Sequence, residues 1–427
     1  MSDLLVLLSP LWPLLLALSK SPRRLLWSAH LALLPAAALL LVSQPLMVKL
    51  PWLYAGAGMG LDSQRWWWLA VSVLFWSIAA FLGGKTTDTG GGNRLLLLSM
   101  AGQLGAILSM DMIVFLSFST LMGYACVGVL CAQGDGAARS AGRLYLMALV
   151  VADLLLFEAM LLVAGFSGSV GFTSLPEALS TFDSSTLYLA LVMTGFALKI
   201  GLWPFHQWLP LAHHPQRLAT SLLLWLGPVA TGLLGVAHWL PLGKVVAPAL
   251  GRGLQAFGVA AMLYCLMVVA VGAQRQRRPA YVVIMVTGGM VTTLGAAMVT
   301  PELWERYGGV AWPLVVALGI GASLGVAGWQ SAGGRAPTPV GVSPQRVAIE
   351  RCYLACVALG RRVTLQSGFA MLARWLIWGA EQRRLSYWVR LFETGERWLR
   401  VWRVALSLLL LLCIVAVALW LLQVEPP

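Results

Sequence analysis

Apolar runs long enough to cross a membrane recur along almost the whole chain. A membrane-spanning helix needs about 17 to 25 mainly apolar residues. Twelve candidate runs are present, at roughly 4–19, 26–48, 66–83, 95–110, 112–132, 144–165, 186–203, 218–240, 254–273, 280–299, 310–329 and 403–422. Only 11% of the 427 residues are charged, which is too little polar surface to cover a soluble globule of this size. The sequence therefore predicts an all-α polytopic membrane protein with about twelve transmembrane helices.

The positions of the basic residues predict how these spans are oriented. With twelve spans, 23 of the 29 lysines and arginines fall on one side of the membrane, five fall on the other, and Lys199 lies inside a span. Cytoplasmic loops of membrane proteins carry an excess of Lys and Arg. We therefore expect a multi-pass protein of the cell inner membrane with both termini on the periplasmic side. This distribution explains the net charge of +13 without a nucleic-acid partner.

Composition divides the chain into four parts. Residues 1–329 are predicted to form a transmembrane bundle of eleven helices, and 330–345 are rich in Gly, Pro and Ser, as a linker is. Residues 346–402 mix arginines with Trp, Tyr, Phe and Leu and hold no apolar run of spanning length, which favours an amphipathic segment on the cytoplasmic surface. Anionic lipids or a cytoplasmic partner protein would both suit that segment. Residues 403–427 hold the last predicted helix.

The cysteines show no metal-site pattern. Of the six, Cys352 and Cys356 are four residues apart and could share a helix face, but two thiolates are only half of a typical zinc site. No motif for nicotinamide, flavin, haem or iron–sulfur binding is present. We expect neither a metal nor a cofactor.

Three ionisable residues stand out at membrane depth: Asp153 and Glu158 in the sixth run, and Lys199 in the seventh. Such groups are costly there and mark ion or proton pathways by default. Asp153 and Glu158 are five residues apart, which is about 140° around a helix, so at most one of them is well aimed at Lys199. The pair is either a structural ion pair between two helices or a proton-carrying group, and the residues alone leave both interpretations open.

The stretch KIGLWPFHQWLP, residues 199–210, adds a proline and a histidine to the lysine. Pro204 lacks a backbone N–H and interrupts a helix, and a broken helix at membrane depth requires surrounding protein or a water-filled cavity. Histidine titrates near neutral pH, which suits a proton relay. The histidines of this region are His206, His213 and His214. Together these residues predict a hydrated polar path.

This stretch resembles a family. Its spacing is K-x4-P-x-H-x-W-x-P-x-A, formed by Lys199, Pro204, His206, Trp208, Pro210 and Ala212. The pattern is similar to that of antiporter-like subunits, which include the L, M and N subunits of respiratory complex I, subunits of membrane-bound hydrogenases, and Mrp-type cation/proton antiporters. Weaker matches extend the resemblance over roughly residues 50–300, at Asp62, Asp153, Ser221, Gly232 and Ala280–Tyr281. The resemblance implies an antiporter-like bundle with a broken seventh helix, a proton-transfer role for Lys199, and other membrane subunits as partners.

Several positions depart from the family pattern. Thr120 stands where the fifth helix of the family carries a glutamate that partners the lysine. The eighth-helix lysine or histidine is missing at Trp225, and an acidic residue and a lysine are replaced by Gln274 and Gln276. About fourteen helices are usual in the family, so this chain is a divergent and shortened member.

Three functions remain open. The chain is a proton-translocating subunit, or a degenerate structural one, in a complex I-like or hydrogenase-like NADH:quinone oxidoreductase assembly, where it would have no redox chemistry of its own. Alternatively, it is the membrane subunit of an ion-coupled transporter, for Mrp-type cation/proton antiport or inorganic-carbon uptake. The third possibility is a non-conducting scaffold.

Overall fold

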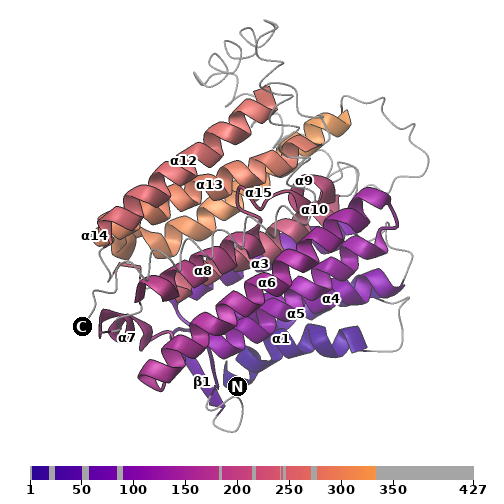
Figure 1. The fold of residues 1–427 in the computed structure, drawn as a ribbon. Helices are drawn as coiled ribbons and strands as arrows, with labels where there is room; N and C mark the ends of the chain where they lie inside the picture. The colour runs from indigo at the N-terminus through magenta and orange to yellow at the C-terminus, as the bar shows by residue number, and fades with distance from the viewer. Residues whose placement is uncertain are drawn as a thin grey trace, which may run out of the picture.

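The computed structural model describes residues 2–18, 25–50, 57–83, 90–181, 185–213, 218–240, 242–243, 247–270 and 277–332. These residues form a bundle of long helices with short helices and a two-stranded hairpin at its ends (Figure 1). The predicted segment 346–402 and the last predicted span, 403–422, lie outside the described residues. The division into four parts therefore stays a prediction.

Long helices make up the bundle. They are α1 (Ser2–Leu18), α2 (Leu25–Leu39), α3 (Ser63–Gly83), α4 (Gly90–Leu108), α5 (Met112–Ala132), α6 (Gly136–Ser167), α8 (Ser185–Ile200), α12 (Pro248–Ala270), α13 (Arg278–Val299) and α15 (Gly309–Ala332). One further rod joins α10 (Leu218–Leu224), the π-helical turn η2 (Trp225–Ala230) and α11 (Thr231–Trp239). Short elements are β1 (Leu46–Leu50), β2 (Ala57–Leu61), α7 (Leu175–Thr181), α9 (Trp208–Ala212), α14 (Pro301–Leu303) and the π-turn η4 (Trp304–Gly308).

The predicted second span, 26–48, is wrong in its second half. Helix α2 ends at Leu39, and Leu46–Leu50 is a strand paired antiparallel with Ala57–Leu61, with Leu46 opposite Leu61. Pro45 explains the difference, because proline lacks an N–H to continue a helix and also disfavours helical backbone in the residue before it. The apolar residues after Pro45 therefore extend into a hairpin.

Six helical stretches in the described part are long and apolar enough to cross a membrane. They are Met112–Ala132, Gly136–Ser167, Ser221–Trp239, Pro248–Val269, Arg278–Val299 and Trp304–Leu324. Four shorter apolar helices accompany them. A mostly helical membrane protein is thus confirmed. The count of twelve spans and the break in the seventh stay predictions.

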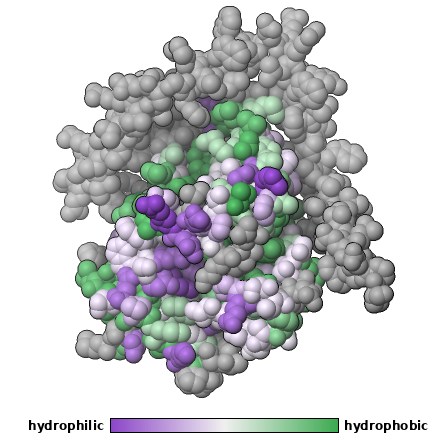
Figure 2. Space-filling model, turned by 90° about the vertical axis from the view of Figure 1, so that its left-hand side faces the viewer, coloured by the Kyte–Doolittle hydropathy of each residue, from purple (hydrophilic) through white to green (hydrophobic). Residues whose placement is uncertain are grey.

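One end of the bundle gathers the N-terminus, the hairpin, α7 and α14 (Figure 1). Asp111 ties this end together, because its carboxylate accepts hydrogen bonds from the backbone N–H of Val114, at 2.8 Å, and of Gly58 in β2, at 2.7 Å. It thereby caps α5 and holds the hairpin against the turn between α4 and α5. Seen from this side, hydrophilic residues occupy much of the described surface (Figure 2).

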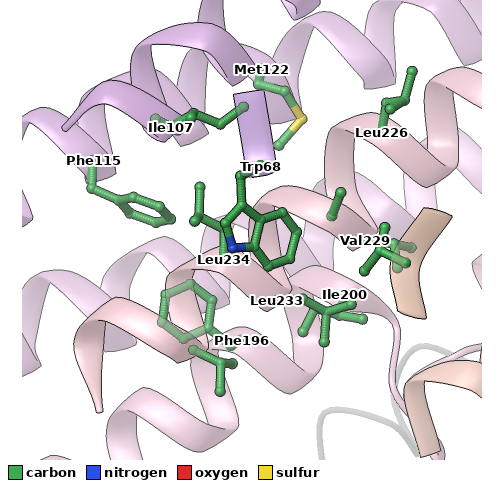
Figure 3. Close-up of a cluster of buried hydrophobic side chains, with 14 of the residues drawn as sticks. Trp68, Ile107, Phe115, Met122, Phe196, Ile200, Leu226, Val229, Leu233 and Leu234 are labelled. Carbon is green, nitrogen blue, oxygen red and sulfur yellow. The ribbon is translucent and has the colours of Figure 1, made fainter. Parts of the chain in front are cut away.

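The core lies where α3, α5, α8 and α11 meet (Figure 3). Trp68, Phe115 and Phe196 are buried there and converge from three different helices. Close approach of α11 to α8 requires Gly232, because a Cβ at that position would overlap the Ile200 side chain. The large aromatic side chains fill the space between helices, and the glycine brings α8, which carries Lys199, against the centre of the bundle.

Candidate functional site

The site begins with Lys199, which is the second-to-last residue of α8. Its ammonium nitrogen lies 2.6 Å from Oδ1 of Asp153, which is near the midpoint of α6. The lysine side chain is 1% exposed and the aspartate side chain 15% exposed. Of the two carboxylates that the sequence left open, Asp153 is therefore the one that pairs with Lys199.

Helix α5 completes the environment of this pair. The Lys199 ammonium also donates to Oγ of Ser119, at 3.0 Å, and the Thr120 hydroxyl donates to Oδ2 of Asp153, also at 3.0 Å. Each carboxylate oxygen thus accepts its own hydrogen bond, as a buried charge requires. These four residues, the polar node, join α5, α6 and α8. Thr120, at the position where the resemblance implies a glutamate, thus contacts Asp153.

Glu158 does not belong to the polar node. Its side chain is exposed on the outside of α6, and it makes no hydrogen bond or ion pair with any described residue. The reason is rotational, because the face of α6 that carries Asp153 packs on α5 and α8 and turns Glu158 away from them.

The segment after Lys199 turns sharply. Gly201 has a φ of +72°, in the left-handed region, and Leu202 N–H bonds to the carbonyl of Ala197 at 2.9 Å, which is the pattern of a Schellman cap. Helix α8 therefore ends at Ile200, four residues before Pro204, and Gly201 provides the stop. Pro204 lies in the following turns, and Pro210 lies inside the short helix α9.

The two described histidines of this segment face other helices. His206 is buried, with Nε2 3.3 Å from the Tyr264 hydroxyl on α12, and its ring lies beside Tyr281 on α13. His213 is also buried, and its Nδ1 lies 3.1 Å from the carbonyl oxygen of Leu209, to which it can donate. His214 lies outside the described residues.

Buried polar atoms without hydrogen-bond partners lie along this region. Tyr145, about two turns before Asp153 on α6, stacks on Trp208 with ring centroids 4.2 Å apart. Within the described residues, the Tyr145 hydroxyl, the Trp208 indole nitrogen and Nε2 of His213 all lack a hydrogen-bond partner. Since buried polar atoms are almost always satisfied, such atoms are places where internal water binds.

Sequence reasoning missed a second buried polar network. Gln103 of α4 donates to the carbonyl oxygen of Leu226 in η2, at 2.6 Å, and accepts a hydrogen bond from the Trp76 indole of α3. Pro228 lies inside η2, where the helical hydrogen bonding is irregular. Gln103 thus satisfies a carbonyl of the distorted turn. Gln103 is the only side-chain amide in the apolar run 95–110, and this isolated polar residue could have predicted a buried hydrogen bond.

The remaining predicted positions lie in or near η2 or beyond the described residues. Trp225, at the start of η2, is buried and its indole nitrogen has no hydrogen-bond partner among the described residues. Gln274 and Gln276 lie outside the described residues. In the part of the chain that the structure describes, no three His, Cys, Asp or Glu side chains gather in a way that could hold a metal ion.

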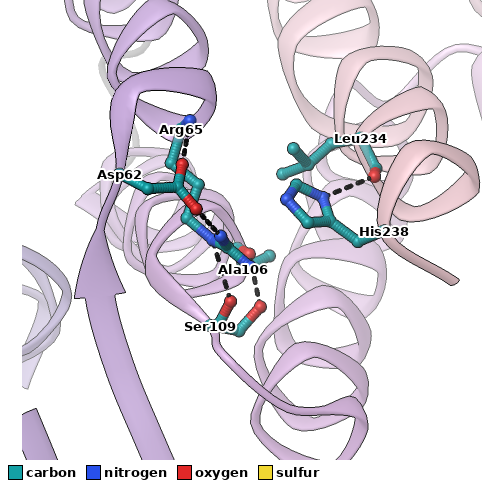
Figure 4. Close-up of polar contacts among 6 residues, drawn as sticks. All are labelled: Asp62, Arg65, Ala106, Ser109, Leu234 and His238. Atoms are coloured by element: carbon teal, nitrogen blue, oxygen red, sulfur yellow. Dashed lines mark hydrogen bonds and ion pairs between the residues drawn. The ribbon is translucent and has the colours of Figure 1, made fainter. Parts of the chain in front are cut away.

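A further polar cluster lies at the hairpin end (Figure 4). Asp62 forms an ion pair with Arg65, and the Arg65 guanidinium also donates to the carbonyl oxygen of Ser109, at 3.1 Å. Nδ1 of His238 lies 2.9 Å from the carbonyl oxygen of Leu234. Arg65 thus joins the start of α3 to the turn after α4, and the His238 contact lies within α11.

The part of the chain that holds the polar node is similar to one family of membrane proteins. Residues 109–298 match the family described as NADH:quinone oxidoreductase/Mrp antiporter, transmembrane. This segment runs from the cap of α5 to the end of α13 and contains the whole polar node. The predicted resemblance to antiporter-like membrane subunits is therefore confirmed.

Curated relatives match parts of the chain. The chain is 28% identical over 155 residues to NADH-quinone oxidoreductase subunit N of Pelobacter propionicus, covering 35% of this chain and 33% of the relative. The subunit N of Deinococcus radiodurans is 26% identical over 213 residues, covering 47% and 42%. Hydrogenase-4 component B of Escherichia coli is 28% identical over 218 residues, covering 49% and 31%. The match thus spans less than half the length of these relatives.

Solved structures share the fold. A membrane-bound sulfane sulfur reductase, an archaeal respiratory membrane complex, contains a chain with a TM-score of 0.62 and 21% identity, covering 76% of this chain and 55% of that one. The Mrp complex from Dietzia sp. DQ12-45-1b contains one with a TM-score of 0.63 and 20% identity, covering 76% and 63%. Both likenesses are likenesses of fold.

Proposed function

We propose that the chain is a membrane subunit of a multi-subunit, proton-translocating assembly of the complex I-like or hydrogenase-like type. In this proposal it lies in the cell inner membrane with both termini on the periplasmic side, and it carries protons without redox chemistry of its own. Its partners are other membrane subunits. The names of the relatives support the type of assembly, and the polar node supports the proton role.

The observation that carries the proposal is the buried Lys199–Asp153 pair with its hydroxyl partners. A proton-carrying group must be stable both with and without its proton. The Ser119 hydroxyl can accept a hydrogen bond from the charged ammonium and can donate one to the neutral amine. The Thr120 hydroxyl keeps Asp153 hydrogen-bonded in either state. Both forms of the lysine therefore have partners in place.

The route away from the pair follows the segment after α8. Buried polar atoms of Tyr145, Trp208 and His213 that lack partners among the described residues offer positions for water molecules. Water in such positions would let protons pass between Lys199 and the end of the bundle opposite the hairpin, which the charge distribution predicts to be cytoplasmic. His206 and His213 lie on this segment and serve as relay groups in the proposal.

Proton flux in Lys199→Arg tests the proton role. Arginine stays protonated in proteins, so it preserves the charge of the pair but cannot release a proton. The complex, reconstituted in liposomes with a pH-sensitive dye inside, should lose proton flux in this variant while its subunits still co-purify. Flux at the wild-type rate would contradict the proposal and favour a structural ion pair. Lys199→Ala is the comparison, because it should lose both flux and stability.

A further inference from the structure

Helix α6 presents one apolar face to the outside of the bundle, and this face carries an acid. The residues of this outer face are Met147, Val150, Leu154, Phe157, Glu158 and Leu161. They recur at the spacing of one helix stripe, and Leu154 is 63% exposed. Figure 1 shows α6 running along the front of the bundle, with α5 and α8 on either side of it.

Glu158 lies on this face at membrane depth. The helix of 32 residues is about 48 Å long, which exceeds the hydrocarbon thickness of about 30 Å. A helix of this length centred on the bilayer extends about 9 Å beyond the hydrocarbon layer at each end. Glu158 is nine residues before the end of α6 at Ser167, or about 13 Å along the axis, which places it about 4 Å inside the hydrocarbon layer. Its carboxylate therefore points from the bundle into the hydrocarbon layer.

No described group of the chain compensates this carboxylate. Asp153, one and a half turns away, is already neutralised by Lys199. An ionisable side chain at membrane depth faces a bundle interior or a charged partner rather than lipid, because the alternative costs several kcal/mol. We infer that a transmembrane helix of another subunit packs on the outer face of α6 and places a lysine or arginine against Glu158. This inference rests on the proposed membership of a multi-subunit assembly and names the chemistry of one partner.

Two other occupants fit this face less well. The last apolar run of the chain, 403–422, contains no lysine or arginine after Arg403, so it offers Glu158 no cation at membrane depth. A second copy related by a two-fold axis along the membrane normal would bring equal depths together, and Glu158 would then face Glu158. The face therefore suits a different chain.

Photo-cross-linking in the native membrane tests the inference. A photoreactive phenylalanine derivative replaces Leu154 or Leu161 in the full-length chain, and the cross-linked peptide is sequenced. We expect a peptide of another subunit that is apolar over about 17 residues and contains a Lys or Arg within one turn of the cross-link. Cross-links to lipid alone, to a second copy, or to a helix without a basic residue would overturn the inference.

Charge reversal at Glu158 provides a second test of the inferred interface. Glu158→Lys places two like charges together and should reduce the cross-link yield by at least about ten-fold, while replacing the basic residue of the partner by glutamate should restore it. Glu177→Lys, which reverses an exposed acid in α7, is the matched control and should leave the yield unchanged. Full yield in Glu158→Lys would overturn the inference.

Stability and flux separate this inference from other effects. Because Glu158 has no partner in the described part of the chain, Glu158→Gln should not change the thermal unfolding of the isolated subunit in detergent. If the complex conducts protons but no partner helix with a Lys or Arg is cross-linked, the inferred interface is wrong and the proton role stands. If such a helix is cross-linked but the complex conducts no protons, the proton role is wrong and the inferred interface stands.

Discussion

At the scale of single residues, charge compensation explains the site. Lys199 and Asp153 each make a second hydrogen bond, to Ser119 and from Thr120, so neither charge is left without a partner. The substitution of the expected glutamate by Thr120 therefore leaves a complete node, because Asp153 supplies the negative charge from the neighbouring helix. Removing either charge should therefore destabilise the fold strongly, because the remaining charge stays buried without its partner.

Asp153→Asn is expected to destabilise the isolated subunit by about 3 to 5 kcal/mol, because it leaves the Lys199 ammonium buried without its counter-charge. Unfolding in detergent, followed by circular dichroism, measures the effect. Glu158→Gln serves as the control, since a surface change of this kind alters stability by less than about 0.5 kcal/mol. Equal effects of the two substitutions would contradict the assignment of Asp153 as the partner.

The Asp62–Arg65 pair should make stability depend on pH in acid. Burial acts to raise the pKa of Asp62, but the neighbouring Arg65 guanidinium and its hydrogen bonds outweigh it, so the pKa lies below the ordinary value of 3.8. A lowered folded-state pKa stabilises the fold above that ordinary value, and the stabilisation is lost as pH falls through the folded pKa.

Asp62→Asn is the corresponding test. Asparagine can still accept the hydrogen bond from the Arg65 backbone N–H, so the substitution removes mainly the charge. We expect a loss of at most about 1 kcal/mol near neutral pH, because the Asp62 side chain is 37% exposed. Wild type and variant should converge in acid. A difference that grows as pH falls would refute this account.

At the scale of elements, local backbone features fix where the polar groups lie. Gly201 ends α8 directly after Lys199 and Ile200, and a Cβ at this position would lie 2.7 Å from the indole nitrogen of Trp208. The turn thus holds Trp208 against Tyr145 of α6. In the neighbouring rod, the carbonyl oxygen of Leu226 in the irregular turn η2 accepts a hydrogen bond from Gln103 of α4. Both irregular segments lie next to the long helices that carry the node.

Gly201→Ala should destabilise the turn after α8 for two reasons, the positive φ and the crowding against Trp208. Strained backbone of this kind costs about 1 to 3 kcal/mol. Gly134→Ala is a matched control, because Gly134 also has a positive φ, +80°, but has nothing within 4 Å of the added Cβ. The excess loss in Gly201→Ala, measured by thermal unfolding, reports the crowding. Equal losses would show that Trp208 does not depend on this glycine.

At the scale of the whole molecule, the charge distribution predicts the orientation in the membrane. The hairpin, α7 and the N-terminus share one end of the bundle, and the sequence assigns this end to the periplasm because few basic residues lie there. Topology reporters fused after Pro427 and within 330–345 should give opposite readings, periplasmic for the first and cytoplasmic for the second. The same reading from both would contradict the twelve-span arrangement.

The segment 346–402 is predicted to lie on the cytoplasmic surface without crossing the membrane. Single cysteines introduced between Arg361 and Arg400 should resist a membrane-impermeant thiol reagent added from outside, and should react once the membrane is opened. Cysteines in the hairpin end, which is expected outside, provide the positive control. Strong labelling from outside anywhere in this range would indicate an additional pair of spans.

The sequence by itself indicated the family that the protein resembles and Lys199, on which the candidate site is centred. Apolar runs of spanning length are local properties of the chain, and so is the spacing from Lys199 to Ala212, so both can be recognised without coordinates. The hairpin after Pro45 was not predicted, because its residues are as apolar as those of a helix. Only the proline indicates that the helix does not continue.

Tertiary structure alone decided how the site is assembled. Asp153 and Glu158 are equally acidic in sequence, and the choice between them depends on which face of α6 packs on α8. Ser119 and Tyr145 are unremarkable within their apolar runs and become part of the site because helices far apart in sequence meet there. Helix packing, which rests on the shapes of many side chains at once, therefore determines which of several polar residues acts together with Lys199.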